Sequence, residues 1–167
     1  MALRTALLAS AASLTAPAAA DTLPEPQGRV VLTITGDIAH TNAEGAARFD
    51  VEMLRAIDET DIATETIWTE GENVFTGVRL DLLLAHVGAE GDEIEAKAIN
   101  DYAVSIPVSD AVEDGPIIAY EMDGRPMPLR EKGPLWVIYP YSSSSAYRTE
   151  VIYSRSIWQL DRLHIPD

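Results

Sequence analysis

The stretch EAKAINDYAVSIPVSDA, from Glu95 to Ala111, contains two alternating apolar runs separated by the polar pair Asn100-Asp101. Apolar and polar residues alternate in 93–99 and again in 102–108, which predicts two strands. Because Asn and Asp favour turns, the pair can be the tight turn between these strands. An amide and a carboxylate also offer hydrogen-bonding groups to a ligand, and the sequence leaves both interpretations open.

The pattern on either side of these strands indicates a domain built mainly from β-structure. Strands are predicted at 29–36, 62–69 and 134–141, helices at 50–57 and 77–88, a hairpin turn at Asp123-Gly124, and loops at 70–77 and 142–145. The tail 151–165 starts and ends like a strand. Two helices against six or more strands predict an α+β fold, mainly β, in a single domain.

The composition excludes several classes of partner and of site. The 167 residues include 27 acidic and 12 basic side chains, a net charge of -15, so nucleic acid and anionic membranes are poor partners. The chain has no cysteine, which excludes disulfides, thiolate catalysis and cysteine-ligated metals. The three histidines lack the local spacing of a zinc site.

The first twenty residues have the features of a secretory signal peptide. Arg4 precedes a short Ala/Leu run that ends in Ala18-Ala19-Ala20, a small-residue cleavage pattern. The apolar run is shorter than the roughly 20 residues of a membrane span. We therefore expect residues 1–20 to be removed and residues 21–167 to form the exported domain, with no direct membrane insertion.

Three clusters of side chains are candidates for ligand binding. Asn100, Asp101 and Tyr102 form the first cluster. Trp68 and Thr69 end a predicted strand, where the alternative for Trp68 is a large core side chain.

The third cluster lies in the segment YSRSIW, residues 153–158. Arg155 stands between two serines and near Trp158. A guanidinium, hydroxyl groups and an aromatic ring together can bind a flat polar heterocycle through hydrogen bonds and stacking. A solvated surface arginine is the alternative.

Four segments, read in order, resemble the molybdopterin-binding domain of sulfite oxidase-type enzymes. They are FTGVRLDLLLAHVGA, EAKAINDYAVSIPVSDA, IIAYEMDGRPMPLREKGPLWVIYPY and RSIWQLDRLHI, and the resemblance extends from Gly28 to Ile165. It implies a mixed sheet and a pocket for a molybdenum-bearing pterin. The redox-active members carry a metal-ligating cysteine before the first segment, whereas this chain has Trp68 or Thr69 there, and neither replaces a soft thiolate.

Small exported proteins of this type resemble periplasmic proteins that report pterins to a membrane-bound regulator of cyclic-di-GMP. The resemblance implies a non-catalytic, periplasmic protein that binds a tetrahydropterin-type pterin and a signalling partner. The alternatives are a molybdopterin-dependent oxidoreductase and an adaptor that has lost its ligand. The candidate binding residues are Trp68, Thr69, Asn100, Asp101, Tyr102, Tyr139, Arg155, Ser156 and Trp158.

Overall fold

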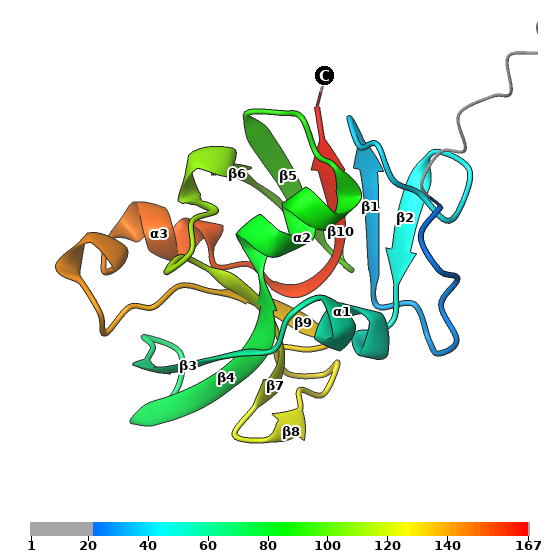
Figure 1. Cartoon of the computed structure of the whole chain (residues 1–167). Helices are drawn as coiled ribbons and strands as arrows, with labels where there is room; N and C mark the ends of the chain where they lie inside the picture. Colours follow the sequence, from blue (N-terminus) through cyan, green and yellow to red (C-terminus); the bar gives the residue numbers. More distant parts are fainter. Residues whose placement is uncertain (1–21, 167) are drawn as a thin grey trace, which may run out of the picture.

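Ten strands form one mixed sheet in the computed structural model, which describes residues 22–166 (Figure 1). The predicted signal peptide lies outside these residues. The strands are β1 (Leu32–Gly36), β2 (Ala46–Phe49), β3 (Thr60–Glu65), β4 (Glu72–Arg79), β5 (Glu93–Ala98), β6 (Ala103–Pro107), β7 (Ile117–Met122), β8 (Arg125–Pro126), β9 (Leu135–Ile138) and β10 (Trp158–Ile165). Their main order is β2-β1-β10-β9-β7-β4-β3. The predicted fold class, α+β and mainly β with a mixed sheet, is confirmed.

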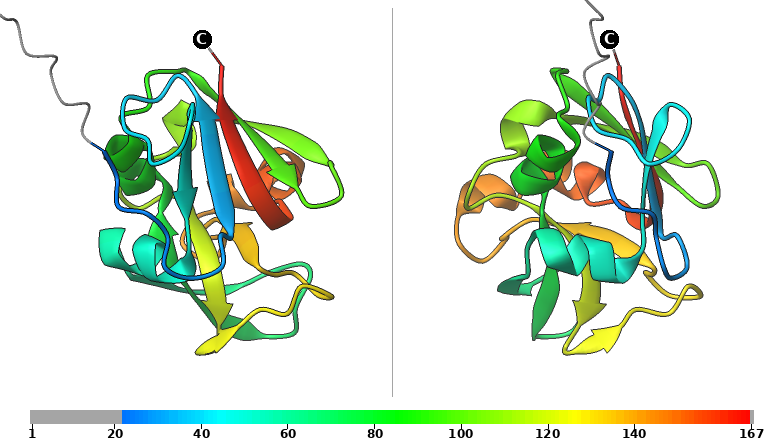
Figure 2. Two further views of the ribbon diagram at one scale, coloured as in Figure 1. Left: turned by 90° about the vertical axis from the view of Figure 1, so that its right-hand side faces the viewer. Right: turned by 45° about the vertical axis from the view of Figure 1, so that its right-hand side comes forward.

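Strand β10 joins the two halves of the sheet. Its first residues pair with β9, through Trp158 and Leu160. Its later residues pair with β5 on one side and, in parallel, with β1 on the other. The register shifts against β9 between Trp158 and Leu160, across Gln159, whose φ is 52°, and against β5 between Leu160 and Arg162. This irregularity lies where β10 passes from its pairing with β9 to its pairing with β5 and β1, and the left view of Figure 2 shows β10 (red) beside β1 (blue).

The hairpin of β5 and β6 answers the question raised by Asn100-Asp101. The pair is a tight turn in which the Asp101 amide donates to the carbonyl of Ala98 at 2.9 Å. Asp101 has a φ of 67°, which Asp tolerates better than most residues. The Asn100 side chain accepts a hydrogen bond from the amide of Tyr102 at 3.2 Å. The turn interpretation is therefore confirmed, although it leaves part of the Asn100 amide available.

Between residues 22 and 166, three α-helices and two short 3-10 helices connect the strands. They are α1 (Val51–Ile57), α2 (Leu80–Val87), α3 (Glu150–Arg155), η1 (Val108–Asp110) and η2 (Ser145–Tyr147). Both predicted helices are confirmed. Asp50 caps α1, and α2 ends at Gly88, which has the left-handed conformation that glycine adopts without strain. The four apolar residues of α2 that fall on one helical face are buried.

Two predicted segments are wrong, and one strand was missed. Residues 70–77 are mostly strand β4, in which Phe75 to Val78 are buried in succession. Because β4 is a central strand that is also contacted by α1 and α2, this stretch lacks the alternation that marks a strand with one solvent-exposed face. The tail starts with helix α3, capped by the Thr149 hydroxyl, despite its β-branched residues. Strand β2 has four residues, too few to show a clear period.

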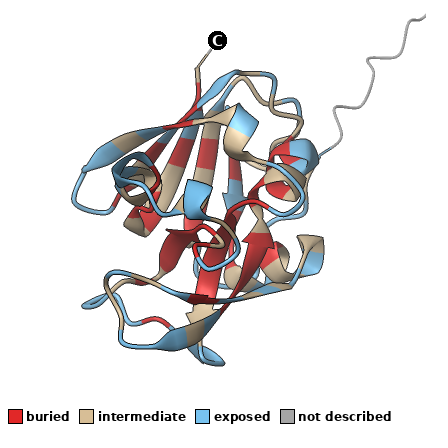
Figure 3. Ribbon diagram, turned by 90° about the vertical axis from the view of Figure 1, so that its left-hand side faces the viewer, coloured by how far each residue is buried: buried red, intermediate tan, exposed pale blue. Residues whose placement is uncertain are grey.

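Buried residues follow the strands through the middle of the molecule (Figure 3). Trp136 and Tyr139 are among the largest fully buried side chains, together with Phe49 and Phe75. Helices α1 and α2 contact each other, and both contact β4. Within the described part of the chain, no helix has the length and apolar character needed to cross a membrane.

Asp50 provides a test of how the N-terminal segment is fixed to α1. Its carboxylate accepts hydrogen bonds from the amides of Gln27, Gly28 and Met53 at 2.7–2.9 Å. Burial opposes ionisation, but these amides outweigh it and hold the Asp50 pKa below its ordinary value of 3.8.

Asp50→Ala is expected to lower the free energy of unfolding by about 2 kcal/mol at neutral pH. A depressed pKa means that the carboxylate stabilises the fold above the ordinary value and that this contribution is lost as the pH falls through the folded-state pKa. Urea unfolding at several pH values should therefore show the difference from wild type shrinking in acid. A difference that stays constant down to pH 2 would contradict this assignment.

Candidate functional site

A cavity of about 420 Å³ lies between the turn of the β5–β6 hairpin, the end of α3 and the start of β10. Its lining is aromatic and neutral. The lining residues are Trp68, Ala98, Asn100, Tyr102, Tyr153, Ser154, Ser156, Ile157, Trp158 and Gln159. Among residues 22–166, no charged side chain lines this cavity. Such a lining suits a flat, uncharged heterocycle better than an anion.

Trp68 forms the floor of an aromatic cluster beside the cavity. The Thr66 hydroxyl accepts hydrogen bonds from the amides of Trp68 and Thr69, at 3.1 and 3.0 Å, and so fixes the turn after β3. The Trp68 ring lies edge-on to four other rings. These rings are Trp136, Tyr141, Tyr153 and Trp158, with centroids 5.6–6.2 Å away. Trp68 therefore contributes to both the core and the cavity wall.

Trp158 has a cation on its ring. The Lys132 ammonium lies 3.8 Å from the centroid of the Trp158 ring, within the range of a cation–π contact. Trp158 pairs with the fully buried Trp136 across β10 and β9, which fixes its backbone. The protein thus positions an electron-rich ring at the cavity.

The polar groups of the lining differ in how fully they are used. The Ser156 hydroxyl accepts from Tyr141 at 2.6 Å and donates to the carbonyl of Ile152 at 2.9 Å, so its bonding capacity serves the fold. Asn100 and Gln159 each use one end of the amide on a backbone group. These two amides are therefore the polar side chains best placed to meet a ligand.

Arg155 and Tyr139 were both predicted to bind the ligand. In the structure they share a hydrogen-bond acceptor, the side chain of Asp110. The Asp110 carboxylate accepts hydrogen bonds from the Tyr139 hydroxyl and the Arg155 guanidinium, each at 2.8 Å. Burial and then the Asp110 hydrogen bond raise the pKa of the fully buried Tyr139. This network ties the end of α3 to η1, next to the cavity rather than in its lining.

Two further predicted residues have local roles in the structure. Asp101 is exposed and pairs with Arg162 at 3.0 Å. The Thr69 hydroxyl bonds to that of Thr66 at 2.7 Å. The cavity therefore brings together Trp68, Asn100, Tyr102, Ser156 and Trp158, whereas Thr69, Asp101, Tyr139 and Arg155 do not line it. The roles of all nine toward a ligand stay predictions.

Five lining residues are not among the nine predicted from the sequence, namely Ala98, Tyr153, Ser154, Ile157 and Gln159. Tyr153 and Ser154 reach the cavity because 150–155 is helical, and the Thr149 cap was the signal for that helix. For Gln159 the sequence holds no local signal, since its position depends on the irregularity in β10.

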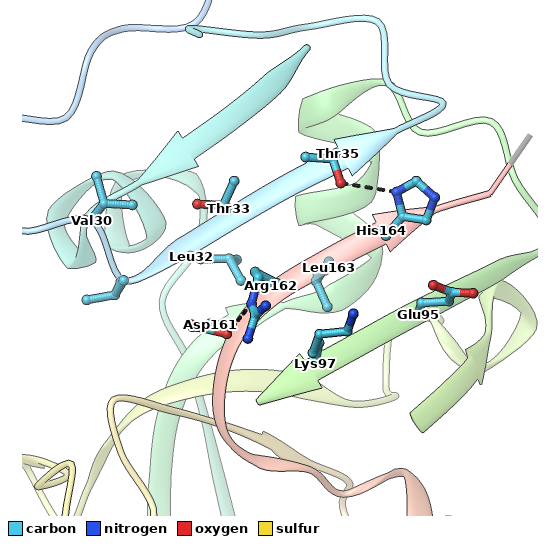
Figure 4. A pocket seen from close by; sticks show the side chains of 11 residues that line it. Val30, Leu32, Thr33, Thr35, Glu95, Lys97, Asp161, Arg162, Leu163 and His164 are labelled. Atoms are coloured by element: carbon cyan, nitrogen blue, oxygen red, sulfur yellow. Dashed lines mark hydrogen bonds and ion pairs between the residues drawn. The ribbon is translucent and has the colours of Figure 1, made fainter. Parts of the chain in front are cut away.

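A larger hollow, of about 520 Å³, lies on the open face of β1, β10 and β5 (Figure 4). Thr33, Thr35, Arg162, His164, Lys97 and Glu95 point from these strands toward it. Arg162 is already paired with Asp161 and Asp101. This hollow offers charged groups of both signs and no Trp or Tyr ring, so the aromatic cavity is the better candidate site.

Comparison with known families decides the identity of the domain. Residues 45–147 match the model of the oxidoreductase molybdopterin binding domain. The chain belongs to this family. The matched range includes Trp68, Asn100 and Tyr102 and ends before α3 and β10. Membership associates the domain with a pterin-type cofactor.

A solved structure of comparable fold is that of the sulfane dehydrogenase SoxCD from Paracoccus pantotrophus. It superimposes with a TM-score of 0.59 at 20% sequence identity, over 81% of this chain and 38% of that chain. The chain therefore spans well under half of the SoxCD chain, and the likeness shows the fold alone. No curated protein matches the chain.

The cavity fits only part of the family's cofactor. The aromatic rings and the two amides suit the pterin ring system. A molybdenum ion would have no thiolate ligand here, because the sequence has no cysteine. In the described residues, no group of three or more Asp, Glu or His side chains is arranged to hold a metal ion. The uncharged lining also offers no cation to a phosphate group.

Proposed function

We propose that this protein binds a tetrahydropterin-type pterin in the aromatic cavity and does not catalyse its turnover. The observation that supports this proposal is the neutral lining of Trp68, Tyr102, Tyr153 and Trp158, in a family associated with molybdopterin and in a chain without cysteine. The rings provide faces for stacking, and Asn100 provides hydrogen bonds to the edge of the heterocycle.

In this proposal the protein acts by reporting its ligand to a partner. The signal-peptide pattern supports export to the periplasm. The resemblance to periplasmic pterin-binding proteins supports a membrane-bound regulator of cyclic-di-GMP as the partner. Tyr102, 58% exposed at the cavity, is a group that a bound ligand and a partner could both contact.

Protein purified from the native periplasm is expected to contain pterin and no molybdenum, because no thiolate is available to the metal. Elemental analysis together with absorption and fluorescence spectra checks this. Pterin with stoichiometric molybdenum, or turnover of sulfite or a sulfoxide, would instead show an oxidoreductase. Neither pterin nor metal, with no binding of added tetrahydropterin, would show an adaptor.

Tyr102→Ala provides the matching test of the site. Tyr102 is largely exposed, so its removal should leave the melting temperature nearly unchanged, while the loss of a stacking face should weaken tetrahydropterin binding about tenfold. Val112→Ala is the control, since Val112 is 46% exposed and does not line the cavity. Equal affinity in the two variants would remove Tyr102 from the site.

A further inference from the structure

Gln159 has a backbone conformation that its residue type does not favour. Three non-glycine residues between 22 and 166 have positive φ, namely Asp101, Asp123 and Gln159. The two aspartates lie in tight turns, where this conformation is common for Asp. Gln159 lies inside strand β10, at a position where glycine would be unstrained. Strain of this kind is found at functional sites, where the side chain is needed despite its cost.

The backbone of Gln159 is fixed on both sides. Its amide donates to the carbonyl of Lys132 at 2.9 Å, and its carbonyl accepts from the amide of Ile99 at 3.0 Å. The second bond joins Gln159 to the residue that precedes Asn100. Gln159 and Asn100 therefore reach the cavity from two segments that are held side by side.

The backbone partners of the two amides define which end of each is available. Gln159 Nε2 donates to the carbonyl of Leu129 at 2.7 Å, which leaves Oε1 as an acceptor. Asn100 Oδ1 accepts from the amide of Tyr102, which leaves Nδ2 as a donor. Within residues 22–166, neither Gln159 Oε1 nor Asn100 Nδ2 has a hydrogen-bond partner. The lining thus presents one donor and one acceptor beside aromatic faces.

We infer that Asn100 and Gln159 form a recognition pair for a cyclic amide edge, in which Asn100 Nδ2 donates to the ring carbonyl of the ligand and Gln159 Oε1 accepts from the adjacent ring N–H. This inference rests on the proposed function and specifies its ligand class, a neutral 2-amino-4-oxo heterocycle. In a 2,4-diamino analogue an amino donor replaces the ring carbonyl, and the adjacent ring nitrogen carries no hydrogen and becomes an acceptor. The analogue would set donor against donor at Asn100 and acceptor against acceptor at Gln159.

Titration calorimetry with tetrahydropterin and its 2,4-diamino analogue tests the pair. Wild type is expected to prefer the 4-oxo compound by about a hundredfold, since two polar contacts are lost and two repulsions replace them. Gln159→Gly should bind the 4-oxo compound about tenfold more weakly and lose most of the preference. Its melting temperature should stay near that of wild type, because the relief of positive φ offsets the lost bond to Leu129.

Gln159→Asn is the second variant. Asn tolerates positive φ and keeps an amide, but its side chain is one methylene shorter, so the protein should fold and still lose the preference. Wild-type affinity and preference in both variants would overturn the recognition pair, as would equal binding of the two compounds by wild type. Failure of wild type to bind either compound would overturn the proposed function itself and the pair with it.

Discussion

Trp68→Ala is expected to lower the free energy of unfolding by about 3 to 5 kcal/mol and to abolish pterin binding. The indole lies edge-on to four aromatic rings at centroid distances of 5.6–6.2 Å, so its removal leaves a hole under the cavity and deprives Tyr153 and Trp158 of their support. Each edge-to-face contact contributes about 0.5 to 1.5 kcal/mol beyond the burial of area. Urea denaturation measures the loss, and fluorescence titration of the folded fraction measures binding.

Ile67→Ala is the matched control for this prediction. Ile67 precedes Trp68 and is 62% exposed, so its truncation should change stability by no more than about 0.5 kcal/mol. Trp68→Phe should fall between the two, since a smaller ring keeps part of the contacts. A Trp68→Ala protein as stable as the Ile67→Ala protein would show that the aromatic cluster does not support the fold.

Asp110→Ala is expected to cost about 3 kcal/mol or more, even though Asp110 is one residue in a chain with many carboxylates. Its side chain is 17% exposed and binds two groups, the Tyr139 hydroxyl and the Arg155 guanidinium. Without Asp110, a buried hydroxyl and a mostly buried cation lose their partner, and that penalty exceeds the value of the ion pair itself. Thermal and urea unfolding both report this loss.

A double-mutant cycle with Arg155→Met separates the penalty of leaving the Arg155 charge unpaired from the penalty of leaving the Tyr139 hydroxyl unpaired. Removing Arg155 as well removes the stranded charge, so the double variant should be more stable than the sum of the single effects predicts. Asp114→Ala, which changes an exposed carboxylate of the following loop, should have almost no effect on stability. Strict additivity of Asp110→Ala and Arg155→Met would contradict a functioning network.

The predictable parts of the fold are those in which a local signal agrees with the final environment. Asp50 before an apolar periodic segment and Asp123-Gly124 between apolar runs mark a helix start and a hairpin without any knowledge of the rest. Strand β4 is different, because Phe75 to Val78 are buried in succession by tertiary packing, to which α1 and α2 contribute, and no local pattern marks it. Its Gly77 is required because a Cβ there would lie 2.3 Å from the carbonyl oxygen of Ile118.

The candidate site follows the same division. Trp68, Tyr102 and Trp158 could be proposed from residue type alone, because large aromatic rings are rare and serve few purposes. Arg155 could not be placed, since its partner Asp110 is 45 residues away in sequence. Gln159 could not be found at all, because what distinguishes it is a dihedral angle set by the bend in β10.

The position of β10 at the centre of the sheet has a consequence for the order of folding. Thr33 of β1 pairs with Arg162 of β10, a sequence separation of 129 residues, and β5 and β9 also depend on β10 for an edge. The strands β3, β4, β7 and β9 pair with one another without β10, but they cannot join the β1–β2 and β5–β6 pairs until this late strand is present. We therefore expect slow folding, limited by the closure of long loops, and a complete sheet only after the synthesis of β10 is finished.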